Sequence, residues 1–160
     1  MSSPKYLLIV SCGKKKSEDL KYYTLKAKDA YKGPIFQVIN KAKREKRWPE
    51  NLKLGIVSAK YGFLRSNDEI TYYDLRMTKS LARKLHSQVI AEIRKWHEDE
   101  SFSLIYILMG KDYLESIQGL GEYIKTEIII ENMGGLGVGQ RKLVNFLDSL
   151  RNTKEKMRIR

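Results

Sequence analysis

Four short apolar runs, each followed directly by glycine and polar residues, limit most strongly what this chain can fold into. The runs are Tyr6–Ser11, Leu54–Ser58, Leu104–Met109 and Glu127–Glu131. Each has the length of a strand and is apolar nearly throughout, which is typical of strands that are covered on both faces in a parallel sheet. We therefore predict four buried, parallel strands.

Helical patterns lie between these runs. Residues 34–48 begin with a proline, which suits the first position of a helix, and end at a Trp-Pro pair. Apolar residues at helical spacing predict a second helix over about 78–96 and a third after Gly139. The alternation predicts a three-layer α/β domain, a mostly parallel sheet of about four to five strands flanked by helices. Since no repeat or linker divides the chain, we expect one domain over 1–150 and a basic tail over 151–160.

The chain is strongly basic. Its 160 residues include 31 Lys and Arg against 19 Asp and Glu, a net charge of +12, clustered in residues 41–47, in the tail and in the run Lys14-Lys15-Lys16. One such run is typical of a solvated helix face, but three together favour a polyanionic partner. Tyrosine, whose ring stacks on bases, has 10 copies against 4 Phe and 2 Trp. We expect a nucleic-acid partner, with an anionic small molecule or a ribosome-like surface as alternatives.

Several other classes of protein are excluded. No apolar run approaches the ~20 residues that cross a bilayer, and the first is too short for the core of a signal peptide, so we expect no membrane partner. A single cysteine cannot form an internal disulfide, which favours a cytoplasmic location. His86 and His97 stand about 16 Å apart along one predicted helix, and no Cys cluster replaces them, so no metal is expected. Segment 134–140 lacks the Lys-Ser/Thr of a P-loop and the spacing of a dinucleotide fingerprint, so no cofactor is expected either.

Polar loops follow every predicted strand, over residues 11–14, 58–62, 110–113 and 134–140. Ligands bind beyond the carboxyl ends of the strands in a parallel sheet, so we predict that these loops share one edge and form the binding site. The glycine-rich loop is interpreted either as a flexible entry to the last helix or as a cradle of backbone amides for phosphate. The binding candidates in these loops are Ser11, Lys14, Ser58, Tyr61, Gly62, Tyr113, Gly137, Gly139 and Gln140.

Three residues are candidates for catalysis. Cys12 ends a predicted strand beside three lysines, which would stabilise a thiolate, although a small packed residue is the alternative. Lys60, like Lys14, is interpreted as a phosphate-binding cation or, if desolvated, an amine nucleophile; a plain exposed lysine is the alternative. Asp74 follows two tyrosines in a basic loop, which suits a general base or a group that stabilises a cation.

Short motifs of this chain resemble a known family. They are, in order, Ser11-Cys12-x-x-x-Lys16, Asp29-x-Tyr31-x-Gly33-x-x-Phe36, Ser58–Leu64, Asp68-x-Ile70-x-x-Tyr73-Asp74, Gly110-x-x-Tyr113 and Gly137-x-Gly139-Gln140. Together they resemble the YaaA-related superfamily, especially its short archaeal, bacterial and phage members. A similar Ser-Ala-Lys-Tyr-Gly stretch occurs in archaeosine synthase, which acts on a deazaguanine base in tRNA.

The resemblance implies association with nucleic acid, because YaaA proteins bind DNA and are linked to DNA protection under oxidative stress. It adds Tyr31 and Tyr73 to the binding candidates. Tyr61, Tyr73 or Tyr113 is expected to stack on a base. This chain departs from the family in being much shorter and in carrying Asp74 and Arg76 in the exchanged order of charge. The ligand and the reaction of YaaA are therefore not transferred.

These observations lead to three functional hypotheses. The first is an enzyme that extrudes a damaged or modified base, from DNA in preference to RNA, and cleaves or exchanges its N-glycosidic bond as a glycosylase does. The second is a non-catalytic protein that binds and protects DNA in the manner of YaaA. The third is an enzyme that acts on a free nucleobase or nucleotide. The oligomeric state is not predicted by the sequence.

Overall fold

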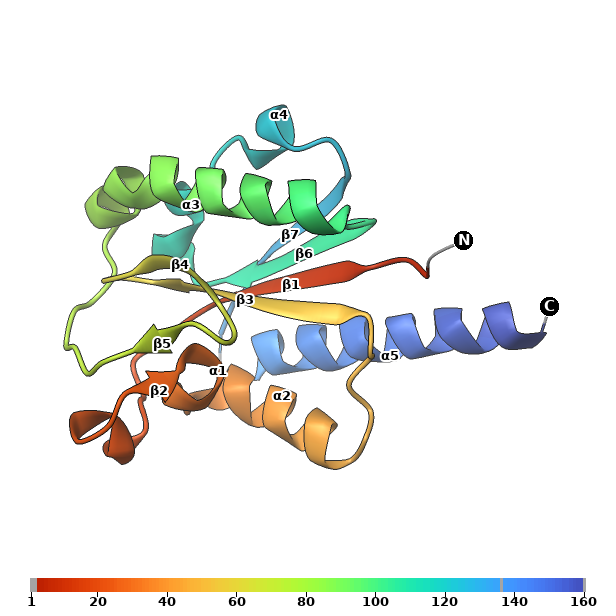
Figure 1. Cartoon of the computed structure of the whole chain (residues 1–160), viewed down its shortest axis with the longest axis horizontal. Helices are drawn as coiled ribbons and strands as arrows, with labels where there is room; N and C mark the ends of the chain where they lie inside the picture. The colour runs from red at the N-terminus through yellow and green to blue at the C-terminus, as the bar shows by residue number, and fades with distance from the viewer. Residues whose placement is uncertain (1–2, 136, 160) are drawn as a thin grey trace.

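The computed structural model describes residues 3–135 and 137–159, with side chains described up to Thr153. Its centre is a five-stranded sheet in the order β4-β3-β1-β6-β7 (Figure 1). Four strands are parallel: β1 (Tyr6–Ser11), β3 (Leu52–Ser58), β6 (Leu104–Met109) and β7 (Glu127–Asn132). Strand β4 (Gly62–Arg65) folds back antiparallel to β3 and had not been predicted as a strand.

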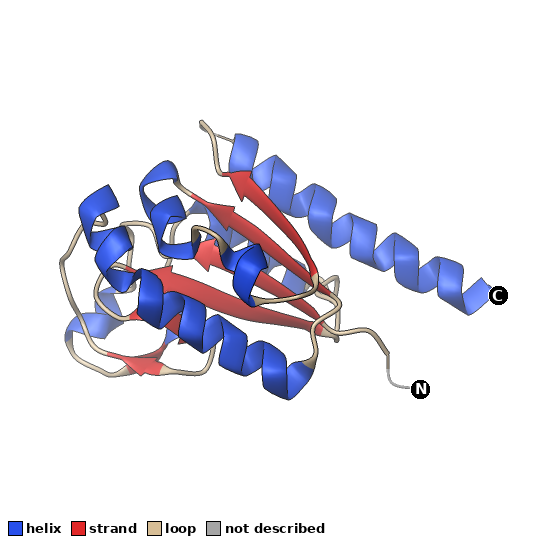
Figure 2. Ribbon diagram, turned by 90° about the horizontal axis from the view of Figure 1, so that it is seen from above, coloured by secondary structure: helices blue, strands red, loops and turns tan. Residues whose placement is uncertain are grey.

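Helices cover both faces of this sheet, as Figures 1 and 2 show. Helices α2 (Pro34–Arg44) and α5 (Val138–Ile159) pack on one face. Helix α3 (Lys79–Glu100), the 3-10 helix η2 (Lys111–Ile117) and the short α4 (Leu120–Tyr123) pack on the other. The predicted three-layer α/β architecture with a mostly parallel sheet is therefore confirmed.

A small group of elements lies beyond the carboxyl ends of the central strands, at the left of Figure 1. It contains the 3-10 helix η1 (Glu18–Lys21), the single-turn helix α1 (Ala27–Ala30) and two short strands. Strands β2 (Leu25–Lys26) and β5 (Glu69–Ile70) pair antiparallel in a separate sheet. The sequence patterns had predicted no element in these segments.

The central strand β1 explains why the apolar runs are nearly continuous. Leu8 and Val10 pack toward α2 and α5, whereas Leu7 and Ile9 pack toward α3, and all four are fully buried. Successive side chains of a strand point to opposite faces, so a strand between two helical layers needs apolar residues at every position.

Strand β7 does not follow this prediction. It lies at the edge of the sheet, and Ile129 and Ile130 remain 37% and 46% exposed. The expectation that all four strands are covered on both faces is therefore wrong for β7. Its composition resembles that of a buried strand, but its place at the edge follows from strand order, which the composition does not encode.

The end of helix α2 also differs from the prediction. Helix α2 stops at Arg44, four residues early, because Lys46 adopts a left-handed conformation (φ 57°). The backbone N–H of Arg47 then bonds the carbonyl of Ala42 at 2.8 Å and that of Lys46 bonds Lys43 at 3.2 Å, which is a Schellman motif.

The expected basic tail continues helix α5. Leu150 is the last buried side chain among those described up to Thr153, Arg151 is exposed, and the helix extends beyond the sheet in both views. The side chains of Lys154, Lys156 and Arg158, and all of Arg160, lie outside the described residues. No helix within the described ranges is long and apolar enough to cross a membrane.

Candidate functional site

The strand order creates a crevice at the carboxyl edge of the sheet. The chain passes from β1 to β3 on one side through α2, and then from β3 to β6 on the other side of β1 through α3. The two connections cover opposite faces, so the crossover direction switches between β1 and β6. In open α/β sheets, ligands bind at such a switch point, outside the carboxyl ends of the strands.

The prediction that the four loops lie at one edge of the sheet is confirmed. Because β1, β3, β6 and β7 are parallel, their following loops all leave the same edge. The backbone N–H of Gly110 donates to the Ser11 hydroxyl at 3.3 Å, which joins the loops after β6 and β1. The N–H of Cys12 bonds Val57 at 3.0 Å and that of Met133 bonds Met109 at 2.8 Å.

The glycine-rich loop lies at the far side of this edge. Three strand spacings, about 14 Å, separate the end of β7 from the end of β3. Gly139 is needed for packing, because a Cβ there would stand 2.5 Å from the Met133 side chain. Gly137 has a positive φ of 80° at the entry to α5, beside the half-buried Gln140, and Leu136 lies outside the described residues. These features favour the interpretation of the loop as an entry to the helix.

Five side chains from distant parts of the sequence meet beneath the crevice. We call them the tyrosine cluster: Cys12, Tyr31, Ser58, Tyr73 and Tyr113. The Tyr73 hydroxyl lies 2.7 Å from both the Tyr31 hydroxyl and the Ser58 Oγ. The Cys12 Sγ lies 3.3 Å from the Tyr113 hydroxyl and 3.7 Å from that of Tyr73. The cluster therefore connects the ends of β1, β3 and β6.

Ser58 sets the direction of the hydrogen bonds in this cluster. Its Oγ accepts from the backbone N–H groups of Lys60 and Tyr61, both at 3.2 Å. A serine oxygen has two lone pairs, so these bonds use its acceptor capacity and leave its own hydrogen for Tyr73. Tyr73 in turn donates to the Tyr31 hydroxyl or to Cys12.

The tyrosines of the cluster are held in their neutral form. Burial, the largest cause, raises the pKa of Tyr31 to about 12. Burial, assisted by the neighbouring Cys12, also raises the pKa values of Tyr73 and Tyr113 far above the ordinary tyrosine value. At neutral pH the three hydroxyls are hydrogen-bond donors. The Lys16 ammonium lies 4.4 Å above the Tyr73 ring, a cation–π contact.

This burial argues against two of the expected roles. Tyr31 and Tyr73 are 0% and 6% exposed, so their rings do not offer a surface on which a base stacks. Cys12 is 3% exposed beside two tyrosine hydroxyls, where its thiol packs as a small buried residue. The sequence placed Cys12 at the correct edge, but it does not show which side chains turn into the protein.

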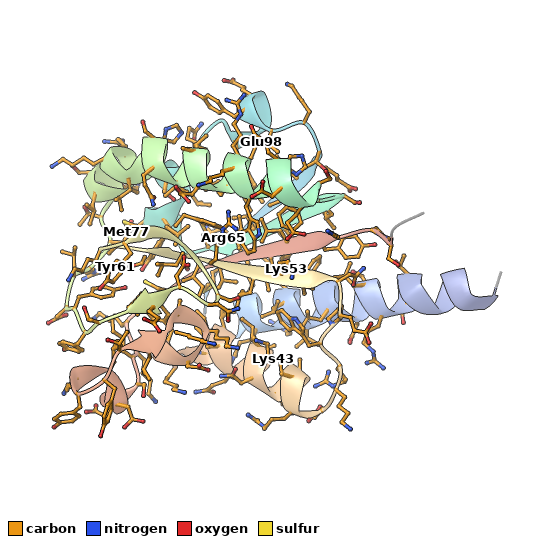
Figure 3. The ribbon with its side chains drawn as sticks, in the orientation of Figure 1. Lys43, Lys53, Tyr61, Arg65, Met77 and Glu98 are labelled. Atoms are coloured by element: carbon orange, nitrogen blue, oxygen red, sulfur yellow. The ribbon has the colours of Figure 1, made fainter. Side chains whose placement is uncertain are left out.

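Tyr61 and Lys60 bring the site to the surface, at the end of the molecule where Figure 3 labels Tyr61. The Tyr61 ring packs edge-on against Tyr73 at 5.6 Å, its hydroxyl lies 3.0 Å from Thr71 Oγ1, and the Lys60 ammonium lies 5.4 Å from its centre. Burial raises the pKa of Tyr61, but the bonds to Thr71 and the Lys60 charge outweigh it, so the pKa is lowered overall. Lys14 is also exposed.

An extended segment over residues 71–78, which we call the strap, crosses this end of the molecule. Tyr73 and Met77 are buried, whereas Tyr72 and Leu75 are 44% and 48% exposed. Asp74 is exposed as well, next to the inward-pointing Tyr73. The structure therefore does not bring Asp74 into the tyrosine cluster, but places it on the outer side of the strap.

Exposed tyrosines beside the strap are a feature that the sequence analysis missed. Tyr22 and Tyr23, directly after η1, are 80% and 66% exposed, and the Lys21 ammonium lies 5.8 Å above the Tyr72 ring. We call Lys21, Tyr22, Tyr23, Lys60 and Tyr72 the tyrosine–lysine surface. The pair of adjacent tyrosines within a polar segment was the pattern that would have indicated it.

The other basic clusters lie elsewhere. Helix α2 runs away from the carboxyl edge, so residues 41–47 at its end lie at the opposite, amino edge of the sheet (Figure 1). Helix α5 runs the same way toward residues 151–159. The three basic clusters therefore do not converge on one site.

Metal ligands are not grouped in the described residues, where no set of three His, Cys, Asp or Glu side chains lies close enough to hold an ion. The His86 Nε2 bonds the carbonyl of Gln118 at 2.6 Å, and the His97 Nδ1 accepts from the backbone N–H of Phe102 at 3.1 Å. Each histidine thus has its own structural contact.

Comparison with protein families gives one match. A family of unknown function (DUF6884) matches residues 7–147, from β1 into α5. The chain belongs to this family. No curated protein and no solved structure matches it. The likeness to the YaaA-related superfamily and to archaeosine synthase therefore stays a prediction from the motifs.

Proposed function

We propose that this protein binds single-stranded or locally opened nucleic acid on the tyrosine–lysine surface. The observation that carries the proposal is the pairing of rings with cations at the carboxyl edge, where Lys21 stands over the exposed Tyr72 and Lys60 stands over the half-buried Tyr61 next to this surface. Stacking on aromatic rings and neutralisation of phosphates are the two interactions by which proteins hold single strands. The net charge of +12 supports the same partner.

The exposure of these rings supports stacking rather than a structural role. Tyr22 and Tyr23 are 80% and 66% exposed, and Tyr72 is 44% exposed. Rings in such positions bury little area in the folded protein, but each covers a base when a strand lies over them. The buried tyrosine cluster lies at the same edge, and its hydrogen bonds hold the loops there in fixed positions.

Fluorescence anisotropy with labelled DNA and RNA oligonucleotides tests the proposal. Tyr72→Ala and Tyr22→Ala should each weaken binding by about 1–3 kcal/mol, since each removes one stacking platform. Tyr72→Phe keeps the ring and should bind as the native protein does. Equal affinities of the Ala and Phe variants would show that binding rests on charge alone.

A second candidate function is cleavage of the N-glycosidic bond of a damaged or modified base, in DNA in preference to RNA. Asp74 supports it, because Asp74 and Tyr72 lie two residues apart on the outer side of the strap. That spacing is about 6.5–7 Å, so a base stacked on Tyr72 brings its sugar within reach of the Asp74 carboxylate. Asp74 would take the proton of the attacking water while the water oxygen bonds the sugar carbon and the bond from that carbon to the base nitrogen breaks, and the same proton then passes to the departing base.

Incubation with oligonucleotides that carry uracil, hypoxanthine, 8-oxoguanine or alkylated bases tests this second function. Asp74→Asn should abolish release of the base and leave binding of the strand unchanged, because the substitution keeps the shape of the side chain. Lys60→Gln should weaken binding, since it removes a cation from the surface. Release of base that continues in Asp74→Asn contradicts the role of Asp74, and no release from any substrate favours a binding protein.

A further inference from the structure

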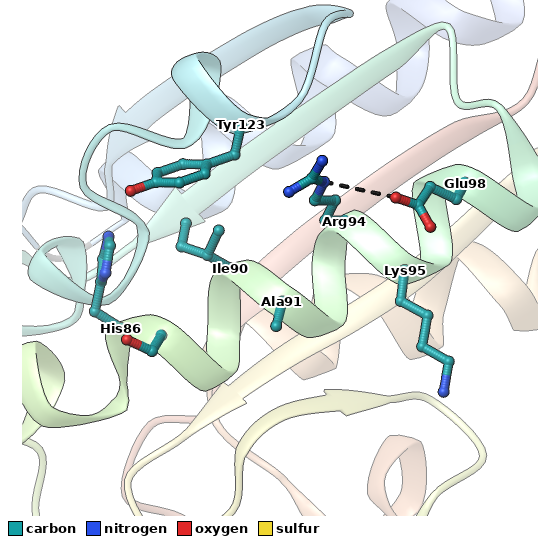
Figure 4. Close-up of a pocket in the computed structure, with 8 residues that line it drawn as sticks. His86, Ile90, Ala91, Arg94, Lys95, Glu98 and Tyr123 are labelled. Atoms are coloured by element: carbon teal, nitrogen blue, oxygen red, sulfur yellow. Dashed lines mark ion pairs between the residues drawn. The ribbon is translucent and has the colours of Figure 1, made fainter.

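A groove lies on the outer face of helix α3, away from the carboxyl edge. Its volume is about 390 Å³, and its walls come from α3 and from Tyr123 at the end of α4 (Figure 4). This volume is within the range of pockets that hold small ligands, about 300–1,000 Å³. Neither the tyrosine cluster nor the tyrosine–lysine surface contributes to it.

One side of the groove is aromatic and apolar. Tyr123 is 47% exposed, and Figure 4 shows its ring above Ile90, a residue that is 5% exposed on α3. The His86 ring stands edge-on to Tyr123, with 6.5 Å between the ring centres and 68° between the planes. The exposed Tyr123 ring and the His86 ring beside it therefore offer an aromatic surface on which a flat ring can pack.

This aromatic surface is held in place by a hydrogen bond. The His86 Nε2 lies 2.6 Å from the carbonyl of Gln118, in the segment that joins η2 to α4. A carbonyl only accepts, so Nε2 carries the hydrogen and the bond fixes the orientation of the imidazole. It also ties the base of α4 to α3, so the two walls keep their spacing.

The other side of the groove carries a cation. Figure 4 shows the Arg94 guanidinium directed toward the side of Tyr123, whereas Lys95 points away. Arg94 Nε lies 3.5 Å from Glu98 Oε1, and both side chains are more than half exposed. Such a long ion pair between exposed side chains contributes little to the stability of the protein. An anionic group of a ligand can therefore compete with Glu98 for the Arg94 guanidinium.

We propose that this groove binds a small planar aromatic ring that carries an anionic group, as a nucleoside monophosphate does. The ring packs on the exposed Tyr123 ring beside His86, and the anionic group binds Arg94. The site is separate from the proposed nucleic-acid surface and does not depend on it.

The test is a titration of the native protein with adenosine monophosphate, adenosine and inorganic phosphate, followed by NMR of the backbone amides. Adenosine monophosphate should shift resonances of residues 86–98 and of α4. Adenosine and phosphate alone should each bind about tenfold more weakly, because each makes only one of the two contacts. Shifts confined to the carboxyl edge, or equal binding of phosphate alone, would overturn the proposal.

Two variants and a matched control localise the site. Arg94→Gln and Tyr123→Ala should each weaken binding of adenosine monophosphate by about tenfold. Arg83→Gln is the control, since Arg83 is also an exposed arginine of α3 with a carboxylate partner, Glu115 at 3.6 Å, but does not line the groove. Tyr123→Phe keeps the ring and should bind normally. An unchanged affinity in Arg94→Gln, or an equal loss in Arg83→Gln, contradicts the site.

Discussion

At the end of β3, the Ser58 hydroxyl accepts two backbone N–H groups and donates to Tyr73, which bonds Tyr31 at 2.7 Å. Every buried hydroxyl of this group thus has a partner, and no buried side-chain nitrogen or oxygen within the described residues is left without one. In this setting the neutral tyrosine hydroxyl is more stable than the phenolate, because a buried phenolate would lose its hydration. The fold therefore depends on these tyrosines keeping their protons.

This dependence predicts how stability changes with pH. Burial raises the pKa of Tyr31 from 10 to about 12, so the folded state holds a proton that the unfolded chain releases earlier. The contribution is present in full below pH 10 and is lost as pH rises from 10 to 12. The free energy of unfolding in urea should fall with pH over this range in the native protein. In Tyr31→Phe this fall should be less steep than in the native protein by about 1.4 kcal/mol per pH unit. A Tyr31→Phe variant whose free energy of unfolding falls with pH as steeply as that of the native protein would contradict the linkage.

At the scale of elements, the turn between β3 and β4 depends on one glycine. Gly62 has a positive φ of 69°, and a Cβ there would overlap Gln88 Oε1, which accepts from the backbone N–H of Phe63 at 3.0 Å. Gly62→Ala should therefore lower the free energy of unfolding in urea by at least about 1–2 kcal/mol, the cost of left-handed backbone alone. The matched change Gly121→Ala meets no atom within 4 Å in α4 and should be neutral or stabilising. A neutral Gly62→Ala would show that this turn relaxes freely.

The strands and the strap differ in how far the sequence predicts them. The bounds of β1 and β6 were predicted to the residue, because strands between two helical layers are apolar at every position. The meeting of Cys12, Ser58 and Tyr113 at one edge followed from parallel strands. The sequence did not predict that Tyr73 points inward and Tyr72 points outward. A shift of one residue exchanges the two faces of an extended segment, and both of these neighbouring positions are tyrosine.

At the scale of the whole molecule, positive charge lies at both ends of the sheet. The tyrosine–lysine surface lies at the carboxyl edge, while residues 41–47 and the C-terminal part of α5 lie toward the amino edge. The 11 residues of α2 alone span about 16 Å between these regions. A stacked tetranucleotide, about 14 Å long at 3.4 Å per nucleotide, reaches one end only. A long strand reaches both, so strand length separates the two contributions.

The final prediction uses this separation. Replacing three exposed cations near the end of α2 with glutamine should weaken binding of a 30-nucleotide strand and leave binding of a tetranucleotide unchanged. The slope of log affinity against log salt for the long strand should fall by about 0.7 for each phosphate that the protein no longer neutralises. The variant carries Lys41→Gln, Arg44→Gln and Lys46→Gln, and a control with the same charge on the other face of the sheet carries Lys79→Gln, Lys84→Gln and Lys125→Gln. An equal effect of both triple variants would mean that the long strand responds to net charge rather than to a track along α2. An effect on the tetranucleotide would place residues 41–47 within its reach and contradict the separation of the two ends.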